Sequence, residues 1–229
     1  MRQFAVIGLG QFGSSVALSL AQKGCEVLAI DRDQDRVDEI ADQVSQSVTV
    51  DAADEKALHS LGMKDIDVAI VSTGEDIEAS ISIVLILKEI GVKEIIAKAV
   101  TQIHGTILKK VGADRVIFPE RDMGERIAES LASPNVMDYS EISETHSIVE
   151  LVAPKKFWGK NISDLKLEED TKVSIAAIKR KVPVVTPEGE TEFKEEINIR
   201  PRPEDKINRS DTLIMIGSFE GIQKVRGIQ

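Results

Sequence analysis

Short apolar runs alternate with helical patterns along the first half of the chain, and this alternation limits the possible folds more than any other feature. The runs, most of them rich in β-branched residues, are Phe4–Ile7, Glu26–Ile30, Ser47–Val50, Val68–Ser72, Glu94–Ala97 and Arg115–Phe118. The helical patterns between them are Phe12–Lys23, Gln34–Asp42, Glu55–Leu61, Ile77–Ile90 and Gln102–Val111. Such runs are typical of strands buried on both faces of a parallel sheet. The alternation therefore predicts right-handed βαβ units and an α/β fold with a doubly wound parallel sheet.

The pattern changes after residue 118. One more helix is expected at Asp122–Ser133, ended by Pro134, and the polar stretch Asn135–Ser147 is expected to connect two domains. Shorter strands are expected further on, at Ile148–Ala153, Val173–Lys179 and Leu213–Gly217. The proline-rich, charged stretch Pro183–Pro203 predicts an exposed loop or a hairpin. We therefore predict a first domain of residues 1–138 and a small α+β domain of residues 139–229.

Composition excludes several classes of function. The 229 residues carry a formal net charge of −10, whereas a nucleic-acid-binding surface has to be basic. Aromatic residues make up only 3% of the chain, which argues against a base-stacking platform. The single cysteine, Cys25, cannot form an intramolecular disulfide or a thiolate metal site. The apolar stretch Ile81–Leu87 is far shorter than the ~20 residues of a membrane span, and no signal peptide is recognisable, so we expect a soluble, cytoplasmic protein.

Residues 8–13, Gly-Leu-Gly-Gln-Phe-Gly, fit the pattern G-x-G-x-x-G and lie between the first expected strand and the first expected helix. In that context the first glycine permits a tight turn, the second lets backbone approach a phosphate, and the third lets helix and strand pack closely. The helix N-terminus adds free N–H groups and a positive dipole end. Asp31 ends the second strand, close to the spacing at which a carboxylate hydrogen-bonds a ribose. These features predict a Rossmann-like nucleotide-binding domain.

Other strand ends should line the same crevice, because ligands of open α/β sheets lie beyond the carboxyl ends of the strands. The residues that follow or end the second to fifth strands are Arg32, Asp33, Asp51, Ala52, Thr73, Gly74, Glu75, Lys98, Ala99 and Val100. The acid at Asp31 disfavours the 2′-phosphate of NADP, although Arg32 follows it directly. Lys98 could contact phosphate or be a solvated lysine, and Asp51 could contact the ligand or cap the next helix.

Catalytic groups are scarce. His59, His104 and His146 are the only histidines, and His104, which opens the helix after the fifth strand, could reach the crevice or lie at the surface. The chain contains no G-x-S-x-G, H-E-x-x-H or Walker A pattern. A dehydrogenase would need a general acid or base beside its nicotinamide. We therefore predict a nucleotide-binding protein that is not an enzyme. The alternatives are a small NAD-dependent oxidoreductase and a stand-alone redox sensor.

Segments along the whole chain carry a resemblance to a known family. In the first half they are Phe4–Gly13, Asp31, Ala79–Ser80, Leu87–Glu89, Lys98–Ala99 and Gly112–Met123. In the second half they are Ser147–Leu151, Ala177–Lys179 and Asp211–Gly217. Together they resemble the KtrA/TrkA-type regulatory subunits of bacterial potassium transporters. The resemblance implies an RCK N-terminal domain over residues 1–138 and an RCK C-terminal (TrkA-C) domain over residues 139–229.

The resemblance also implies a function. Family members bind ATP, ADP or NAD in the N-terminal domain, and their dimers assemble into an octameric ring. The ring docks on the cytoplasmic face of an integral-membrane potassium-transporting subunit of the KtrB/TrkH type, and exchange of nucleotide gates ion flux. This chain would then be a cytoplasmic protein, peripheral to the inner face of the plasma membrane. Its helix at Asp122–Ser133 would bury Met123, Ile127 and Leu131 against a neighbouring subunit.

The nucleotide site of the family can be carried over position by position. It implies a phosphate turn that holds Gly8, Gly10, Gln11, Phe12 and Gly13, and a ribose acid at Asp31. It implies adenine-flanking residues and further contacts at Asp51, Ala52, Thr73, Gly74, Glu75, Lys98 and His104. Glu120 would help to hold a cation (Mg, Ca or Na) at the terminal phosphate between subunits.

Two positions depart from the family pattern. Gln11 stands where KtrA-like proteins usually carry an arginine that meets the terminal phosphate, and a neutral amide cannot supply that charge-assisted hydrogen bond. We therefore expect weaker discrimination of ATP from ADP, or a role for NAD. Glu168 stands where members that bind cyclic di-AMP carry an arginine. A carboxylate repels a phosphodiester, so we expect no cyclic di-AMP binding.

Overall fold

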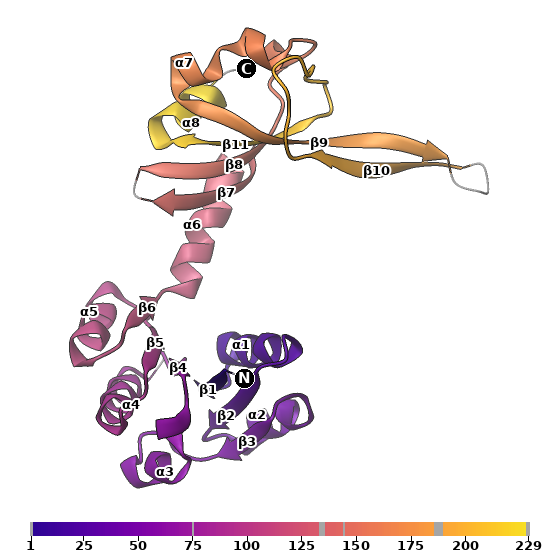
Figure 1. Ribbon diagram of the computed structural model, residues 1–229. Helices are drawn as coiled ribbons and strands as arrows, with labels where there is room; N and C mark the ends of the chain where they lie inside the picture. Colours follow the sequence, from indigo (N-terminus) through magenta and orange to yellow (C-terminus); the bar gives the residue numbers. More distant parts are fainter. Residues whose placement is uncertain (1, 75, 133–135, 144, 186–189, 228–229) are drawn as a thin grey trace. The chain divides into compact units, whose positions relative to one another are not determined.

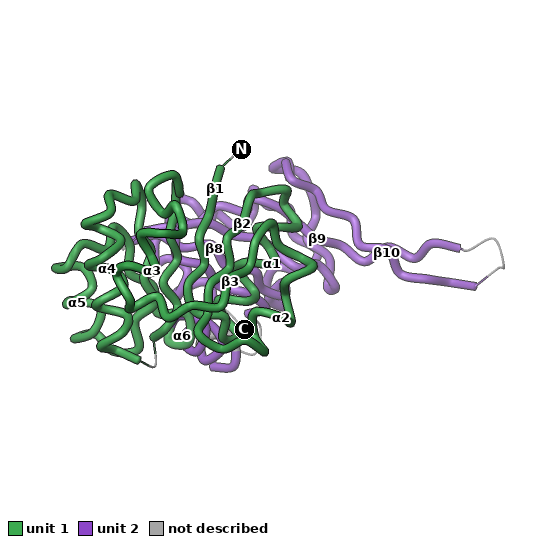
Figure 2. The backbone as a smooth tube through the Cα atoms, turned by 90° about the horizontal axis from the view of Figure 1, so that it is seen from below, with its two compact units in different colours: residues 1–121 green, residues 122–229 purple. Residues whose placement is uncertain are grey.

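The computed structural model describes residues 2–74, 76–132, 136–143, 145–185 and 190–227. The chain divides into two compact units, residues 1–121 and residues 122–229 (Figure 2). This division lies earlier than the domain boundary at 138/139 that the sequence suggests, because most of the helix after Pro119 belongs to the second unit. The domain boundary itself stays a prediction.

The first unit is built on a six-stranded parallel sheet with the order β3-β2-β1-β4-β5-β6 (Figure 1). Its strands are β1 (Gln3–Ile7), β2 (Glu26–Asp31), β3 (Gln46–Thr49), β4 (Val68–Val71), β5 (Glu94–Lys98) and β6 (Arg115–Ile117). Its helices are α1 (Gln11–Gln22), α2 (Gln34–Ile40), α3 (Glu55–Ser60), α4 (Ile77–Ile90) and α5 (Gln102–Val111). Short 3-10 helices follow α2 at Ala41–Gln43 and α3 at Met63–Asp65. The predicted Rossmann-like fold is confirmed. The strand order reverses between β1 and β4, which is where such sheets open a ligand crevice.

Helices cover both faces of this sheet, which explains why its strands are apolar throughout. Val6 of β1 packs in a cluster with residues of α1 and α2. Its neighbours Ala5 and Ile7 pack with residues of α3, α4 and α5. Successive side chains of a strand point to opposite faces. A strand with helices on both sides therefore lacks the alternation of polar and apolar residues and is apolar at nearly every position.

Side-chain caps fix where the helices start. Asp33, Asp54, Asp76 and Thr101 each accept a hydrogen bond from a backbone N–H in the first turn of α2, α3, α4 and α5. One of the two roles considered for Asp51 is thereby wrong: Asp54 caps α3, and the Asp51 carboxylate accepts a hydrogen bond from Ala53 N at 2.9 Å.

The second unit is a five-stranded antiparallel sheet with the order β10-β9-β11-β8-β7. Its strands are β7 (Val136–Ser143), β8 (His146–Val152), β9 (Val173–Val185), β10 (Thr191–Asn198) and β11 (Thr212–Ser218). Helices α7 (Leu167–Thr171) and α8 (Phe219–Arg226) accompany it, with 3-10 helices at Lys155–Phe157 and Ile162–Leu165. Most of α6 (Pro119–Ala132) also belongs to this unit. One face of the sheet is apolar: Val149, Leu151, Leu213 and Met215 pack against Ile222 and Val225 of α8.

The interpretation of residues 135–147 as a connection is wrong for the described part of this stretch, because Val136–Ser143 form strand β7 and His146 begins β8; residues 135 and 144 lie outside the described residues. β7 is an edge strand that pairs only with β8, and Val136 is its only fully buried described residue. An edge strand with so little burial needs few apolar side chains. The polar sequence therefore hid a strand.

The stretch 183–203 contains a hairpin, one of the two alternatives that its sequence allowed. β9 continues beyond the predicted end at Lys179 to Val185 and pairs with β10 (Figure 1). The base of this hairpin is fixed by Arg180, whose guanidinium donates two hydrogen bonds of 2.7 Å to the fully buried carboxylate of Asp211. That carboxylate also raises the pKa of Arg180.

Candidate functional site

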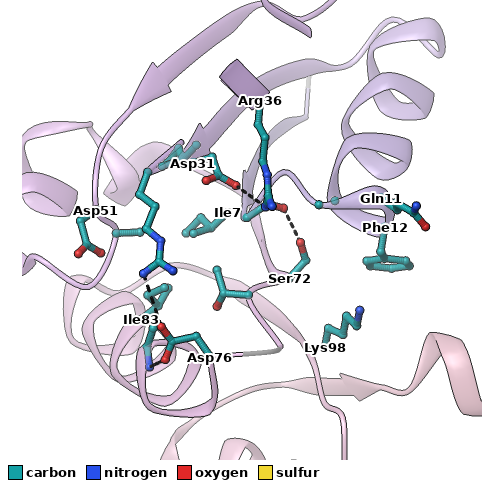
Figure 3. Close-up of a pocket in the computed structure, with 18 of the residues that line it drawn as sticks. Ile7, Gln11, Phe12, Asp31, Arg36, Asp51, Ser72, Asp76, Ile83 and Lys98 are labelled. Atoms are coloured by element: carbon teal, nitrogen blue, oxygen red, sulfur yellow. Dashed lines mark hydrogen bonds and ion pairs between the residues drawn. The ribbon is translucent and has the colours of Figure 1, made fainter. Parts of the chain in front are cut away.

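A cavity of about 550 Å³ opens at the carboxyl ends of the central strands of the first unit (Figure 3). Twelve of the sequence-predicted residues line it: Gly8, Gly10, Gln11, Phe12, Gly13, Asp31, Arg32, Asp51, Ala52, Thr73, Lys98 and Glu120. Eight other lining residues were not predicted as site residues from the sequence: Ile7, Ile30, Arg36, Val50, Ser72, Asp76, Ala79 and Ile83. The predicted residues Asp33, Gly74, Ala99, Val100 and His104 do not line the described cavity. Glu75 lies outside the described residues.

The glycine turn has the geometry of a phosphate cradle. Gly8 has a φ of +91°, which side chains rarely allow. A Cβ on Gly13 would lie 1.9 Å from the carbonyl oxygen of Gly8, so only glycine fits there. Around Gly10 nothing would meet a Cβ within 4 Å, which leaves open space above the turn. Gly10 also precedes α1 with no side chain capping the helix, so the N–H groups of that helix end are available to an anion.

The carboxylate of Asp31 fixes the glycine turn by accepting a hydrogen bond from its backbone. Its side chain is 7% exposed and accepts hydrogen bonds from Leu9 N at 2.5 Å and Asp33 N at 2.9 Å. Arg36 on α2 points to the same carboxylate, with Nη1 3.8 Å from Oδ2 (Figure 3). A carboxylate has about four acceptor positions, so two remain for a ribose hydroxyl. Asp33, although absent from the lining, positions Asp31 by its backbone and caps α2 by its side chain.

Two residues of opposite charge that line the cavity form an ion pair with each other. Arg32 follows β2 and Asp76 caps α4, and their closest side-chain atoms are 3.6 Å apart. Because β2 and β4 flank β1 in the sheet, the strand order brings these residues together. The pair is largely exposed, and the expectation against NADP stays a prediction.

Lys98 and Glu120 form an ion pair on the side of the cavity where the glycine turn lies. The Lys98 side chain is only 12% exposed, and its ammonium lies 6.0 Å from the ring centre of Phe12. Gly74 lies next to its stem: a Cβ there would be in ordinary van der Waals contact with Lys98 carbons, at 3.5 Å. The hydrogen bond from Lys98 lowers the pKa of Glu120. Lys98 is thus a packed cation on the side of the glycine turn, and Glu120 is a carboxylate beside it.

His104 takes a different place from the crevice position considered for it. It is 1% exposed, and its Nε2 lies 2.8 Å from Ser80 Oγ on α4. Ser80 Oγ donates to Ile77 O, so the histidine N–H donates to the serine. Nδ1 faces the backbone N–H of Val100 at 3.4 Å. Burial lowers the pKa of His104, which keeps the ring neutral as a bridge between α4 and α5.

Features associated with metals and membranes are few. Within the described ranges no three His, Cys, Asp or Glu side chains come together as a metal cluster would require. Glu120 as a cation ligand therefore stays a prediction. None of the helices described here is both long enough and apolar enough to cross a bilayer.

Glu168, the acid found where a cyclic di-AMP site would need an arginine, accepts a hydrogen bond of 2.6 Å from Ser174 Oγ.

Comparison with known proteins gives full-length relatives. The TrkA-N domain family model matches residues 4–119. The Ktr system potassium uptake protein C of Bacillus subtilis is 42% identical over 223 residues, which cover 97% of this chain and 95% of the relative. The Ktr system potassium uptake protein A of the same organism is 39% identical over the same shares of both chains. The Ktr system potassium uptake protein A of Vibrio alginolyticus is 38% identical over 78% of this chain and 81% of the relative.

Solved structures share the fold. The GsuK channel bound to NAD matches 99% of this chain with a TM-score of 0.66 and 16% identity. The chain spans only 39% of that channel. The GsuK RCK domain matches with a TM-score of 0.65 and also 16% identity, over 47% of its length. The family model, the full-length relatives and the shared fold confirm the resemblance found in the sequence. The chain belongs to the TrkA-N family, among the Ktr system potassium uptake proteins.

Proposed function

We propose that the protein is the nucleotide-binding regulatory subunit of a potassium uptake system. The observation that carries the proposal is the cavity, whose lining combines a buried acid suited to a ribose, a glycine turn suited to a diphosphate and a packed lysine suited to a terminal phosphate. Relatives at 38–42% identity are potassium uptake proteins by name, and they supply the physiological context. Nucleotide binding is then a signal, and ion flux is what the signal controls.

Each group of the cavity has a task in this proposal. Asp31 accepts hydrogen bonds from the ribose hydroxyls, and the glycine turn with the N-terminus of α1 receives the diphosphate. Lys98 neutralises the last phosphate, and Glu120 holds a cation beside it, with Mg, Ca or Na as candidates. Phe12 packs below the Lys98 ammonium and keeps it in place. These groups bind and orient a nucleotide, and we propose that the protein does not turn it over.

The identity of the nucleotide depends on Gln11, which lines the cavity at the first position of α1. Its amide can donate a hydrogen bond to a phosphate but brings no charge. A third phosphate on the nucleotide therefore adds little binding affinity beyond that of the second. We therefore propose that ADP, ATP and NAD(H) compete on similar terms. Cyclic di-AMP is not among the proposed ligands, since Glu168 would repel its phosphates.

Regulation requires that the ligands distinguish two shapes of the protein. A ligand shifts a conformational equilibrium only by its difference in affinity for the two states. Glu120 sits in the first turn of α6, and α6 continues into the second unit. We propose that the phosphate or cation bound beside Lys98 and Glu120 changes the conformation of α6 and, through this helix, the conformation of the assembly.

The exposed apolar positions of α6 suggest the assembly. Met123, Ile127 and Leu131 recur at a spacing of four residues and are 51%, 53% and 77% exposed. Side chains at this spacing form one stripe of a helix. We propose that the stripe is buried against a second copy, that such dimers assemble into an octameric ring, and that the ring docks on a KtrB/TrkH-like membrane subunit at the inner face of the plasma membrane.

Calorimetric titration of ATP, ADP, NAD and NADH tests the proposal, with light scattering to measure the assembly. The wild type should bind all adenine nucleotides with similar affinity. The Gln11→Arg variant should gain at least about tenfold in preference for ATP over ADP, the effect of one strong charge-assisted hydrogen bond. Gln22→Arg adds the same charge at the far end of α1 and should change nothing.

Three outcomes would contradict it. The assignment of Gln11 fails if the wild type already prefers ATP many-fold. The regulatory role fails if nucleotide leaves potassium flux unchanged in vesicles that hold the membrane subunit. Turnover of NADH with a carbonyl substrate would instead favour the oxidoreductase alternative.

A further inference from the structure

The hairpin of the second unit contains a segment that only two strands build. β11 pairs with β9 as far as Lys179, which lies opposite Thr212. Beyond that point β9 pairs with β10 alone, so that Arg180–Val185 and Thr191–Glu196 form a two-stranded ribbon. We call this ribbon the arm. It extends away from the rest of the second unit (Figure 1).

The arm is poorly buried for a regular structure. All eight side chains of β10 are exposed, and Val185 and Phe193 are 69% and 70% exposed. An isolated two-stranded hairpin is at best marginally stable in water, and an edge strand with free N–H and C=O groups is a template for another strand. The arm is therefore a surface that a further strand would complete.

The sequence of β10 is complementary to itself. In an antiparallel pair related by a two-fold axis perpendicular to the sheet, the residue on the axis faces its own copy. With Glu195 on the axis, Phe193 lies opposite Ile197 of the second copy, and Lys194 lies opposite Glu196 of the second copy. Opposed residues share a face of the sheet, so each pair can make contact. Every such pair occurs twice by symmetry.

The two glutamates on the axis do not stand alone. Within one chain Glu195 lies opposite Lys181 of β9. The axis would therefore be crossed by a row of four charged groups, lysine and glutamate from one copy followed by glutamate and lysine from the other. The like charges in the middle are each flanked by an opposite charge.

Neighbouring registers are worse. With Lys194 on the axis, two lysines face each other and Glu192 lies opposite Glu196 twice. With Glu196 on the axis, two glutamates face each other, and Arg180, which lies opposite Glu196 within one chain, is already paired with Asp211. Glu195 then lies opposite the apolar Ile197. Like charges directly opposite one another are destabilising. With Phe193 on the axis, Lys194 lies opposite Glu192, but only residues 191–195 of each strand overlap, against residues 192–198 in the register centred on Glu195, and Ile197 lies beyond the overlap. We propose that β10 pairs with β10 of a second copy, in the register centred on Glu195, and joins two sheets into one.

Disulfide trapping in the full chain tests the register. In a Cys25→Ser background, the Glu195→Cys variant places two thiols opposite each other at a Cα separation of about 4.5–5.5 Å, within the range of a disulfide. Mild oxidation should convert most chains to covalent dimers. The matched control is Glu192→Cys on the same strand, whose copies would lie about 20 Å apart. It should form at least tenfold less dimer.

A second trapping experiment tests the pairing of unlike residues. Coexpressed Lys194→Cys and Glu196→Cys chains should cross-link to each other more than to themselves. Equal cross-linking of Glu195→Cys and Glu192→Cys, or none at either, would overturn the proposal. So would a Glu195→Cys thiol that is protected only when the membrane subunit is present, since the occupant would then be that subunit. None of these readouts requires nucleotide, so they stand or fall apart from the proposed function.

Discussion

The ammonium of Lys98, at the end of β5, is paired with the carboxylate of Glu120 in the first turn of α6. Lys98 is packed and 12% exposed, whereas Glu120 is 67% exposed. A terminal phosphate that reaches Lys98 must therefore displace the glutamate or recruit a cation that neutralises it. The pair makes the phosphate end sensitive to both the ligand and the ions around it.

Replacing Glu120 by glutamine should raise the affinity for ADP and ATP when divalent cations are chelated. The expected gain is about fivefold, the size of a largely exposed ion pair. When Mg or Ca is added, the wild type should gain more affinity than Glu120→Gln, because the variant lacks the cation ligand. Calorimetry with and without cation measures both effects. Glu89→Gln, on the exposed side of α4, serves as control; identical cation dependence in all three proteins would refute the role of Glu120.

Two glycines of the turn should behave in opposite ways. Gly13→Ala should destabilise the first unit, because its Cβ would lie 1.9 Å from Gly8 O and 2.5 Å from Ser72 Oγ. Gly10→Ala meets nothing and should leave stability unchanged. It should nevertheless weaken nucleotide binding, because the methyl group occupies the space above the turn. Thermal unfolding followed by circular dichroism, together with nucleotide titration, distinguishes the two. Equal stability of both variants would contradict the packing described for the third glycine.

The buried His104 should make stability depend on pH. Its pKa lies below the ordinary value of 6.5 because burial disfavours the charged ring. Between its folded pKa and 6.5 the unfolded state binds more protons, so stability should be complete above pH 6.5 and fall as the pH drops further. The slope can reach about 1.4 kcal/mol per pH unit. Urea unfolding at several pH values should show this slope in the wild type and in His59→Gln. It should be reduced in His104→Gln, and an unchanged slope there would assign the effect to other groups.

The ion pair at the base of the hairpin should be essential to the second unit. Arg180→Gln leaves the fully buried Asp211 carboxylate without its two guanidinium hydrogen bonds. Loss of one partner of a buried pair costs about 3 kcal/mol or more. Trp158 packs against the core of this unit and is the only tryptophan, so its fluorescence reports unfolding there. Arg200→Gln, an exposed position nearby in sequence, should be neutral. Equal midpoints for both variants would contradict the prediction.

The first unit could be predicted from sequence almost element by element, whereas in the second unit the inner strands β8, β9 and β11 were predicted and the edge strands β7 and β10 were not. β4, Val68–Val71, is buried at every position, and the glycines that end α4 and α5 mark their boundaries clearly. In the second unit β7 has a single fully buried described residue, and β10 has none. Both are edge strands, and their sequences carry little of the periodicity on which prediction depends.

The site was predictable where it is local in sequence. The glycine turn and Asp31 belong to adjacent elements, and the spacing between them in the sequence indicates a nucleotide site. Arg36 and Asp76 come from the first turn of α2 and the cap of α4, and only the strand order brings them to the cavity. His104 shows the opposite case. It follows a strand end, as a ligand-binding residue would, but α4 offers the nearby hydroxyl of Ser80, and the ring turns inward.

The hydrogen bonds that Asp31 accepts from Leu9 N and Asp33 N are made within the protein and require no ligand. The turn is therefore preorganised, and a nucleotide spends little of its binding free energy on ordering the loop. What is common to all adenine nucleotides is recognised by a rigid part of the protein, and it cannot favour one conformational state over another. Differences in affinity between these nucleotides must therefore arise beside Lys98 and Glu120. Because little free energy is spent on ordering the turn, small differences in the phosphate contacts remain measurable in the binding free energy.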